Sequence, residues 1–484
     1  MKTRVAPLLV ALLVSGNSTS AASSPQTGRT IPGVEGTWMG ALEAQQVEFP
    51  FAVTFERTDG ELRGDMDIIA SLSPDIEVAD IRGDGGSVSF SLPLPGGESL
   101  RFEGRISQTF LDGEAVYSKD GKVRGTFSLR AVPLESLPVW ARGGDTWDWP
   151  DNHRAYWPTG DWKTIGSADA GLDGQALSAA AEVIRERFPA VRALLIAQGG
   201  VLAYEEYFHG GSVTEPFNIK SVSKGMITAL VGVAIREGHL AGQDAKVAAL
   251  VPQYFGKAKD KMKTEIRLHH LLDMTSGIRW IENGAPTAKW ATRGHSSGYY
   301  LSLPLDCPPG ECFNYSTAST HLVSEILMRH TETTTRAFAE RHVLDPIGLD
   351  IRSWLRGKGG VHIGGAEVFM TARDLARLGL LLLSQGVWDG HEIIPMDWVH
   401  ECVAYQSEGQ PFVGSYGYGW WRRSIHGHPA FMGKGYGGQF VVVVPDSDLV
   451  VVVASDLSSP EMAPILEQWV CESVVPAALP GEES

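Results

Sequence analysis

The hydrophobic pattern of the chain changes after about residue 132, and this change divides the sequence into two parts that must fold differently. From Val34 to Val132, apolar residues alternate with polar ones, as in Phe51, Val53 and Phe55. Alternation with a period of two is typical of strands that bury one face. Asp-Gly pairs, which suit tight hairpin turns, separate the runs at Asp59-Gly60, Asp84-Gly85, Asp112-Gly113 and Asp120-Gly121. About eight short strands without a helical stretch predict a small all-β domain over residues 34–132, either a barrel or a sandwich.

This first part gathers no His, Cys, Ser and Asp residues into a catalytic group. We therefore expect a packed accessory domain, and the alternative is a barrel that carries a ligand. The chemistry has to be sought later in the chain.

Residues 1–22 predict a signal peptide. Lys2 and Arg4 form a short basic region, Val5 to Val14 an apolar stretch, and Ser18 to Ala22 supply the small residues of a cleavage zone. The apolar stretch has about ten residues, which is too short to cross a bilayer core of about 30 Å. A retained N-terminal anchor is the alternative. We expect an exported protein, periplasmic or secreted, with no integral membrane segment after cleavage.

Composition excludes several classes of partner and site. The 484 residues carry 41 Lys and Arg against 57 Asp and Glu, a net charge of −16, and an acidic chain repels the phosphate backbone of nucleic acids. Four cysteines cannot form a disulfide scaffold at this length, and no C-x-x-C pair suggests a structural zinc site.

The second part of the chain has a mixed pattern. Residues 133–173 are rich in Trp, Pro, Gly and Asp and predict an ordered linker, because its five tryptophans would be costly to leave in water. From residue 174 to 478, a hairpin pattern at 193–208 and another at 440–454 enclose helical patterns such as Ser221 to Glu237 and Thr371 to Leu383. Strands at both ends with helices between them predict an α+β domain built on one antiparallel sheet.

The segment Asn218 to Met226 holds the most informative spacing. Ser221 and Lys224 lie three residues apart, so they share one face of a helix. A serine at a helix start is favoured as a nucleophile, because free amides and the helix dipole stabilise negative charge there. A neighbouring neutral lysine can accept the serine proton. The same spacing also suits a capping serine and a surface lysine, so it needs further support.

Other motifs provide that support. They are LHHLLDMTSGI (268–278), a Tyr315-Ser316-Thr317 segment, TARDLARLGLLLLSQGVWDG (371–390), YGYGWW (416–421) and Gly433-Lys434-Gly435-Tyr436, which we expect to open a strand. With these motifs, residues 174–475 resemble the serine β-lactamase and penicillin-recognising superfamily, above all its class C-like hydrolases. These include esterases, DD-peptidases and 6-aminohexanoate-dimer hydrolases. The resemblance implies an antiparallel sheet flanked by helices and no metal or organic cofactor.

The resemblance also implies roles for individual residues. Ser221 is expected to be the nucleophile, Lys224 its partner, and Tyr315 a proton-transfer residue that exchanges protons with the nucleophile and the leaving group. Thr317 stands where the family has an asparagine that holds the side-chain amide of β-lactam substrates. This difference weakens the case for β-lactam binding.

The third motif of the family, which here reads Gly433-Lys434-Gly435, has a cation in its first position, where this chain has Gly433. Recognition of a substrate carboxylate at this position is therefore in doubt. Lys434 follows, and we include Thr317, Gly433, Lys434 and Gly435 as candidate substrate-binding residues. Alternation along a strand would nevertheless turn the Lys434 ammonium away from the cleft. The backbone amides of Ser221 and Tyr436 are the expected oxyanion hole.

Several patterns compete with this interpretation. Gly294-His295-Ser296-Ser297-Gly298 matches the nucleophile elbow of α/β-hydrolases, but its flanks do not fit the strand and helix which that elbow requires. The His269-His270 and His426-Gly427-His428 groups lack the carboxylates that would complete a metal site. Cys307 and Cys312 flank the loop before Tyr315, and export permits a disulfide between them, with two unpaired thiols as the alternative.

Two classes of function follow from these residues. The first is an exported serine hydrolase that acts on a small ester or amide through an acyl-enzyme, with β-lactamase or DD-peptidase activity on cell-wall-type substrates as the alternative activity. The second is a catalytically silent sensor or binding protein with the same fold. We favour the hydrolase because a binding role would not require Ser221, Lys224 and Tyr315 together.

Overall fold

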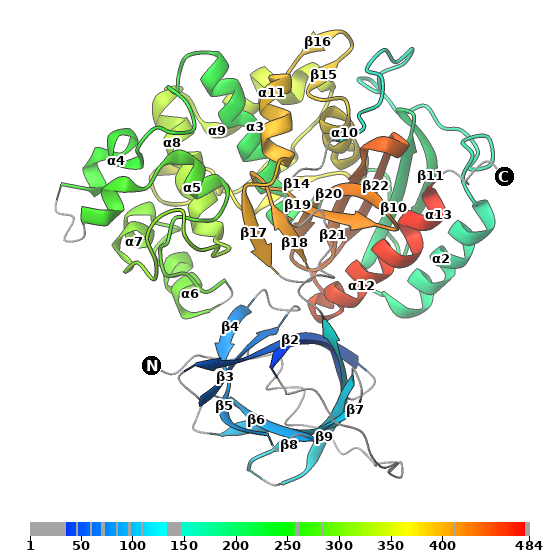
Figure 1. Cartoon of the computed structure of the whole chain (residues 1–484). Coiled ribbons are helices and arrows are strands. Elements are labelled where there is room, and N and C mark those ends of the chain that lie inside the picture. The colour runs from blue at the N-terminus through cyan, green and yellow to red at the C-terminus, as the bar shows by residue number, and fades with distance from the viewer. Residues whose placement is uncertain are drawn as a thin grey trace. The chain divides into compact units, whose positions relative to one another are not determined.

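A computed structural model describes residues 35–479, except 45–46, 59–60, 69–72, 84–85, 95–97, 108–109, 120, 133–146, 257–260, 283 and 411–412. The signal-peptide prediction for residues 1–22 lies outside the described residues. By their contacts, Met1–Val139 with Glu282–Gly284 form one compact unit, and Trp140–Ile281 with Ala285–Ser484 form a second (Figure 1). We call them the N-terminal and C-terminal units. No described helix is long and apolar enough to span a membrane.

The N-terminal unit is a curved antiparallel sheet. Its strands are β1 (Gly36–Ala44), β2 (Val47–Thr58), β3 (Glu61–Ile68), β4 (Ser73–Glu77), β5 (Ala79–Gly83), β6 (Ser87–Pro93), β7 (Ser99–Ser107), β8 (Phe110–Tyr117) and β9 (Val123–Val132). They are ordered β4-β3-β2-β1-β9-β8-β7-β6-β5. The two outer strands are joined through Val78, whose amide donates a hydrogen bond to the Gly64 carbonyl of β3 at 3.0 Å. The sheet therefore closes into the barrel that Figure 1 shows.

Aromatic side chains fill this barrel. Phe51, Phe55, Phe90, Phe102 and Phe127 are all buried, and the rings of Phe90 and Phe102 stack at 4.8 Å between centroids. An interior occupied by side chains favours the packed accessory domain over the ligand-carrying barrel.

One predicted turn is wrong. Asp112-Gly113 lies inside β8, where Gly113 pairs with Gly104 of β7. A Cβ atom on Gly113 would lie 2.1 Å from the Glu103 carbonyl oxygen, so glycine serves here to let two strands approach closely. The Gly121 amide does close a turn onto the Tyr117 carbonyl at 2.9 Å, as expected. The pairs at 59–60 and 84–85 lie outside the described residues.

The C-terminal unit is an α+β domain around an antiparallel sheet ordered β11-β10-β22-β21-β20-β19-β18-β17. These strands are β10 (Val191–Gln198), β11 (Val201–Tyr207), β17 (Ser407–Gln410), β18 (Gly414–Tyr416), β19 (Trp421–Ile425), β20 (His428–Gly435), β21 (Gln439–Val444) and β22 (Leu449–Ser455). Both predicted hairpins, β10–β11 and β21–β22, are confirmed. The valine runs of β21 and β22 are uninterrupted because both faces of these strands are buried.

Helices cover both faces of this sheet and fill the long insertion between β11 and β17. They are α2 (Gly174–Arg187), α3 (Ser223–Arg236), α4 (Val247–Leu250), α5 (Leu268–Leu272), α6 (Ala285–Thr292), α7 (Ser297–Ser302), α8 (Thr317–His330), α9 (Thr335–Ala339), α10 (Ala372–Leu383), α11 (Met396–Val403), α12 (Ala463–Trp469) and α13 (Val475–Ala478). Short strands β12 (Phe217–Asn218), β13 (Ser353–Trp354) and β14 (Val368–Met370) form a small sheet, and β15 (Val387–Trp388) pairs with β16 (His391–Glu392). The helix α10 packs on β10, β21 and β22, while α2, α12 and α13 lie together on the other face (Figure 1).

The segment Trp147–Ile165, which we call the strap, belongs to the C-terminal unit by its contacts. Trp162 is buried, and the other tryptophans of the strap pack against the same core. Trp147 meets Phe431 of β20 edge-on at 5.5 Å between ring centroids, and Trp149 stacks on His400 of α11 at 5.2 Å. The described tryptophans of the predicted linker therefore pack into the C-terminal unit, and Trp140 lies outside the described residues.

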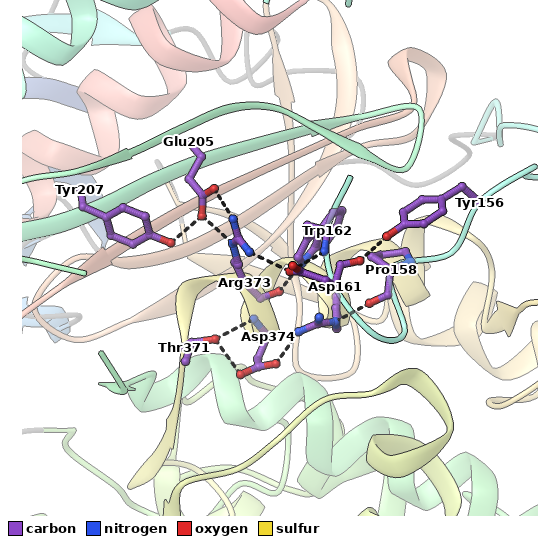
Figure 2. Close-up of polar contacts among 10 residues, drawn as sticks. Tyr156, Pro158, Asp161, Trp162, Glu205, Tyr207, Thr371, Arg373 and Asp374 are labelled. Carbon is purple, nitrogen blue, oxygen red and sulfur yellow. Dashed lines mark hydrogen bonds and ion pairs between the residues drawn. The ribbon is translucent and has the colours of Figure 1, made fainter. Parts of the chain in front are cut away.

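A polar network holds the strap on the rest of the C-terminal unit (Figure 2). The Arg373 guanidinium of α10 donates to both carboxylate oxygens of Glu205 in β11, each at 2.7 Å, and to Asp161 of the strap at 2.8 Å. Burial alone would raise the pKa of Glu205, but hydrogen bonds from Arg373 and Tyr207 outweigh burial and lower that pKa. The Trp162 indole donates to the Arg373 carbonyl at 3.1 Å. One arginine therefore joins the strap, a helix and the outermost strand.

This network predicts the effect of Arg373→Met on stability. The side chains of Arg373 and Glu205 are 21% and 15% exposed, so the loss of the cation leaves a largely buried carboxylate unpaired. We expect the free energy of unfolding to fall by about 2 kcal/mol, less than for a fully buried pair. Urea unfolding followed by tryptophan fluorescence measures this quantity for the C-terminal unit, because Trp38 is the only tryptophan within residues 34–132.

The control is Arg352→Met, which breaks an exposed pair with Asp350. It should change the same free energy by no more than about 0.5 kcal/mol. Equal effects of the two variants would contradict a specific role of Arg373 in holding the strap.

Candidate active site

Ser221 lies in a single 3-10 turn, Lys220–Val222, that leads directly into α3. The helix is buried over most of its surface and carries Lys224 in its first turn. The Lys224 Nζ atom donates to Ser221 Oγ at 2.8 Å. Ser221 itself is half-buried, whereas Lys224 is fully buried.

Two more oxygens lie around Lys224 Nζ. Nζ donates to Thr317 Oγ1 and to the Gly365 carbonyl, each at 3.0 Å. Together with Ser221 Oγ, these oxygens surround Nζ with three polar groups from separate parts of the chain. The Tyr315 ring lies on another side of Lys224, with its centroid 4.8 Å from Nζ. The structure therefore brings together Ser221, Lys224, Tyr315 and Thr317, as the motifs predict.

Tyr315 is held in place by rings and by its loop. It precedes Ser316, the N-cap of α8, and it stacks on Trp421 at 5.6 Å between centroids. The Cys307–Cys312 disulfide is formed, which decides the alternative that the sequence left open. The loop that it closes is tied to the segment after α5, because the Gly310 amide donates to the Thr275 carbonyl at 2.8 Å.

The glycines of the third motif allow β20 to pack closely against the turn that carries Ser221. A Cβ atom on Gly433 would lie 2.9 Å from Val222 Cγ1, and one on Gly435 would lie 2.5 Å from the Ile219 carbonyl oxygen. The motif ends β20 rather than opening a strand, and Tyr436 follows it with a side chain that is 51% exposed. The β19–β20 ladder stops at the Trp421–Met432 pair, so Gly433 to Gly435 pair with β21 alone.

The structure does not bring Lys434 to this group. Its side chain turns to the opposite face of β20, where its ammonium pairs with Glu467 of α12. Alternation along the strand is the physical reason, since Gly433 and Gly435 face the Ser221 turn. Trp420 occupies the space beside Gly433, 3.1 Å from where its Cβ would stand.

Three comparisons with known proteins bear on this geometry. Residues 178–469, well over half of the chain, match the family model described as Beta-lactamase. The chain belongs to the beta-lactamase family. It is 26% identical over 291 residues to the 6-aminohexanoate-dimer hydrolase of Paenarthrobacter ureafaciens, a match that covers 56% of this chain and 73% of that protein.

Esterase EstB of Burkholderia gladioli is 28% identical over 147 residues, which span 28% of this chain and 37% of the esterase. Among solved structures, EstCE1, a hydrolase with promiscuous acyltransferase activity, has a TM-score of 0.51 and 19% identity. That alignment covers 63% of this chain and 99% of EstCE1, and at this identity it shows the fold. The protein is thus a serine hydrolase of the beta-lactamase family, with esterase and amide-hydrolase relatives.

Sequence reasoning missed several residues that build this beta-lactamase-family site. Gly365 supplies its carbonyl to Lys224 from a segment that shows no recognisable pattern. Gly419 has φ of +82°, and its Cβ would lie 3.0 Å from the backbone of Lys224. The glycines of YGYGWW could have indicated this close approach, because any side chain at Gly419 would displace α3.

The competing motif at 294–298 has a structural role. Ser296 is the N-cap of α7, and its hydroxyl accepts a hydrogen bond from the Tyr299 amide at 3.4 Å. No strand among the described residues leads into it, as a nucleophile elbow would require.

Contact between β20 and the Ser221 turn predicts that Gly433→Ala impairs the enzyme. The added methyl group would overlap Val222 and Trp420, so we expect the free energy of unfolding to fall by about 1–3 kcal/mol. We also expect slower acylation, because the same contact positions Ser221. Urea unfolding and the rate of labelling by a fluorophosphonate measure the two effects.

Gly160→Ala is the matched control, since a Cβ atom at this position meets no atom within 4 Å. It should leave both measurements unchanged. A Gly433→Ala protein that behaves like this control would show that β20 does not press on the nucleophile turn.

Proposed function

We propose that this protein hydrolyses an ester or amide through an acyl-enzyme on Ser221. The observation that carries the proposal is the 2.8 Å contact between Ser221 Oγ and the buried Lys224 Nζ, with Tyr315 beside them. A lysine takes a serine proton only when it is neutral, and burial disfavours its charged form. Ser221 becomes the nucleophile as its proton moves to Lys224.

The reaction then follows from the residues around the attacked carbonyl. Ser221 Oγ forms a bond to the carbonyl carbon, and the amides of Ser221 and Tyr436 hold the negative oxygen of the tetrahedral intermediate. Tyr315 passes a proton to the leaving alcohol or amine as the carbon–heteroatom bond breaks. Water then attacks the acyl-enzyme, gives a proton to the same residues, and releases the acid and free Ser221.

The polar groups around Ser221 favour a neutral substrate. Gly433 carries no cation, and the Lys434 ammonium is held by Glu467. Thr317 donates or accepts only through a hydroxyl that already contacts Lys224. We therefore propose short-chain esters or linear amides as substrates, ahead of β-lactams and D-Ala-D-Ala peptides. One of the two curated relatives is named an esterase, which agrees with the ester part of this class.

We also propose that the protein is exported to the periplasm or the medium. Residues 1–22 have the pattern of a signal peptide. The Cys307–Cys312 disulfide supports the proposal, since such bonds persist in oxidising compartments.

Replacement of the proposed catalytic residues tests the mechanism. Ser221→Ala should abolish hydrolysis of p-nitrophenyl acetate and labelling by a fluorophosphonate. Lys224→Ala and Tyr315→Phe should each lower kcat by about 10²- to 10⁴-fold, the usual effect of losing a proton-transfer group. Ser296→Ala is the control and should keep full activity. Activity that survives Ser221→Ala would disprove the assignment.

Substrate preference tests the second part of the proposal. The absent cation removes one charge-assisted hydrogen bond to a β-lactam carboxylate, worth about 1.5–3 kcal/mol. Short p-nitrophenyl esters or linear amides should therefore exceed nitrocefin in kcat/KM by at least about tenfold. Efficient nitrocefin hydrolysis by the unmodified protein would contradict it.

A further inference from the structure

The residue before the nucleophile has an unusual backbone. Lys220 has φ of +48°, in the left-handed region that only glycine enters freely. Because Lys220 is joined directly to Ser221, its backbone sets the direction in which the Ser221 side chain leaves the turn. Strained conformations of this kind persist only where the surroundings enforce them.

Two side chains hold this turn. Asn218 Oδ1 accepts a hydrogen bond from the Lys220 amide at 3.1 Å. One oxygen of the Glu367 carboxylate accepts from Lys220 Nζ at 2.7 Å, and the other accepts from Asn218 Nδ2 at 2.9 Å. The side chains of Lys220 and Glu367 are only 17% and 26% exposed, so solvent weakens this pair less than a surface ion pair.

Glu367 is itself well anchored. It precedes β14, whose Val368 carbonyl accepts from the Ile219 amide at 2.9 Å, and β14 pairs with β12. The same stretch of chain supplies the Gly365 carbonyl to Lys224. A single segment, residues 365–368, therefore contacts the residue before the nucleophile and the proposed base.

We infer that Glu367 is a positioning residue, which holds Lys220 in its left-handed conformation and so keeps Ser221 Oγ in reach of Lys224. The inference rests on the proposed role of Ser221. Without the carboxylate, Lys220 can relax toward negative φ, and the hydroxyl then moves from its place beside Nζ. Chemistry at Ser221 should slow while substrate binding changes little, because Glu367 touches neither substrate nor reacting atoms.

The first experiment compares two Glu→Gln variants of the full chain. Glu367→Gln keeps the length and shape of the side chain but removes its charge and one of the two oxygens that accept from Asn218 and Lys220. It should slow fluorophosphonate labelling and lower kcat by at least about tenfold, with KM within about threefold. Glu205→Gln breaks an ion pair of similar exposure on the outermost strand β11. It should lower stability and leave kcat within about twofold.

A second experiment tests whether Glu367 acts through the backbone conformation of Lys220 or only stabilises the fold. Glycine adopts positive φ without strain, so in a Lys220→Gly background the further change Glu367→Gln should slow labelling by no more than about threefold. The effects of Lys220→Gly and Glu367→Gln on the labelling rate should therefore not add, and a double-mutant cycle measures this coupling. Lys220→Arg, which keeps the ion pair, should retain most of the rate.

The outcomes are distinct. Labelling of the unmodified protein at Ser221 comes first, and its absence would overturn the proposed function and this inference with it. If the unmodified protein is labelled, an equal loss from Glu367→Gln in both backgrounds, or no loss in either, would overturn the inference alone. A folded Lys220→Gly protein that is not labelled would also overturn it, because the ammonium rather than the backbone would then be what Ser221 needs.

Discussion

The amine group of Lys224 lies fully inside the protein, and this burial determines which segments must meet around it. A lysine without exposed surface must find polar partners for its amine group inside the protein. It finds them in Ser221, Thr317 and the Gly365 carbonyl, which come from three separate parts of the chain. The start of α3, the start of α8 and the segment before β14 must therefore converge on one point. The glycines of β20 and of the β18–β19 turn then allow the sheet to close against it.

The local parts of this arrangement were predictable from sequence. Ser221 and Lys224 share a helix face, Gly199-Gly200 joins two strands, and Thr371 caps α10 through the Asp374 amide at 3.1 Å. Each follows from spacing within a few residues, where backbone geometry dictates the result. The resemblance to a known family added Tyr315, which spacing alone would not connect with Ser221.

The remaining features depend on contacts between distant segments. Asp112-Gly113 has the composition of a turn, yet β7 approaches so closely that the glycine is needed inside a strand. The tryptophans of the strap indicated order but not their partners on β20 and α11. Glu367 carried no signal, because its partners Asn218 and Lys220 lie about 150 residues earlier.

The proposed mechanism requires that Ser221 is acylated during turnover. Mass spectrometry of protein quenched in acid during hydrolysis of p-nitrophenyl acetate, followed by peptide mapping, tests it most directly. We predict one acetyl group on the peptide that contains Ser221, absent from Ser221→Ala. Turnover with the acetyl group on another residue, or with no acylated protein while Ser221→Ala remains active, would contradict it.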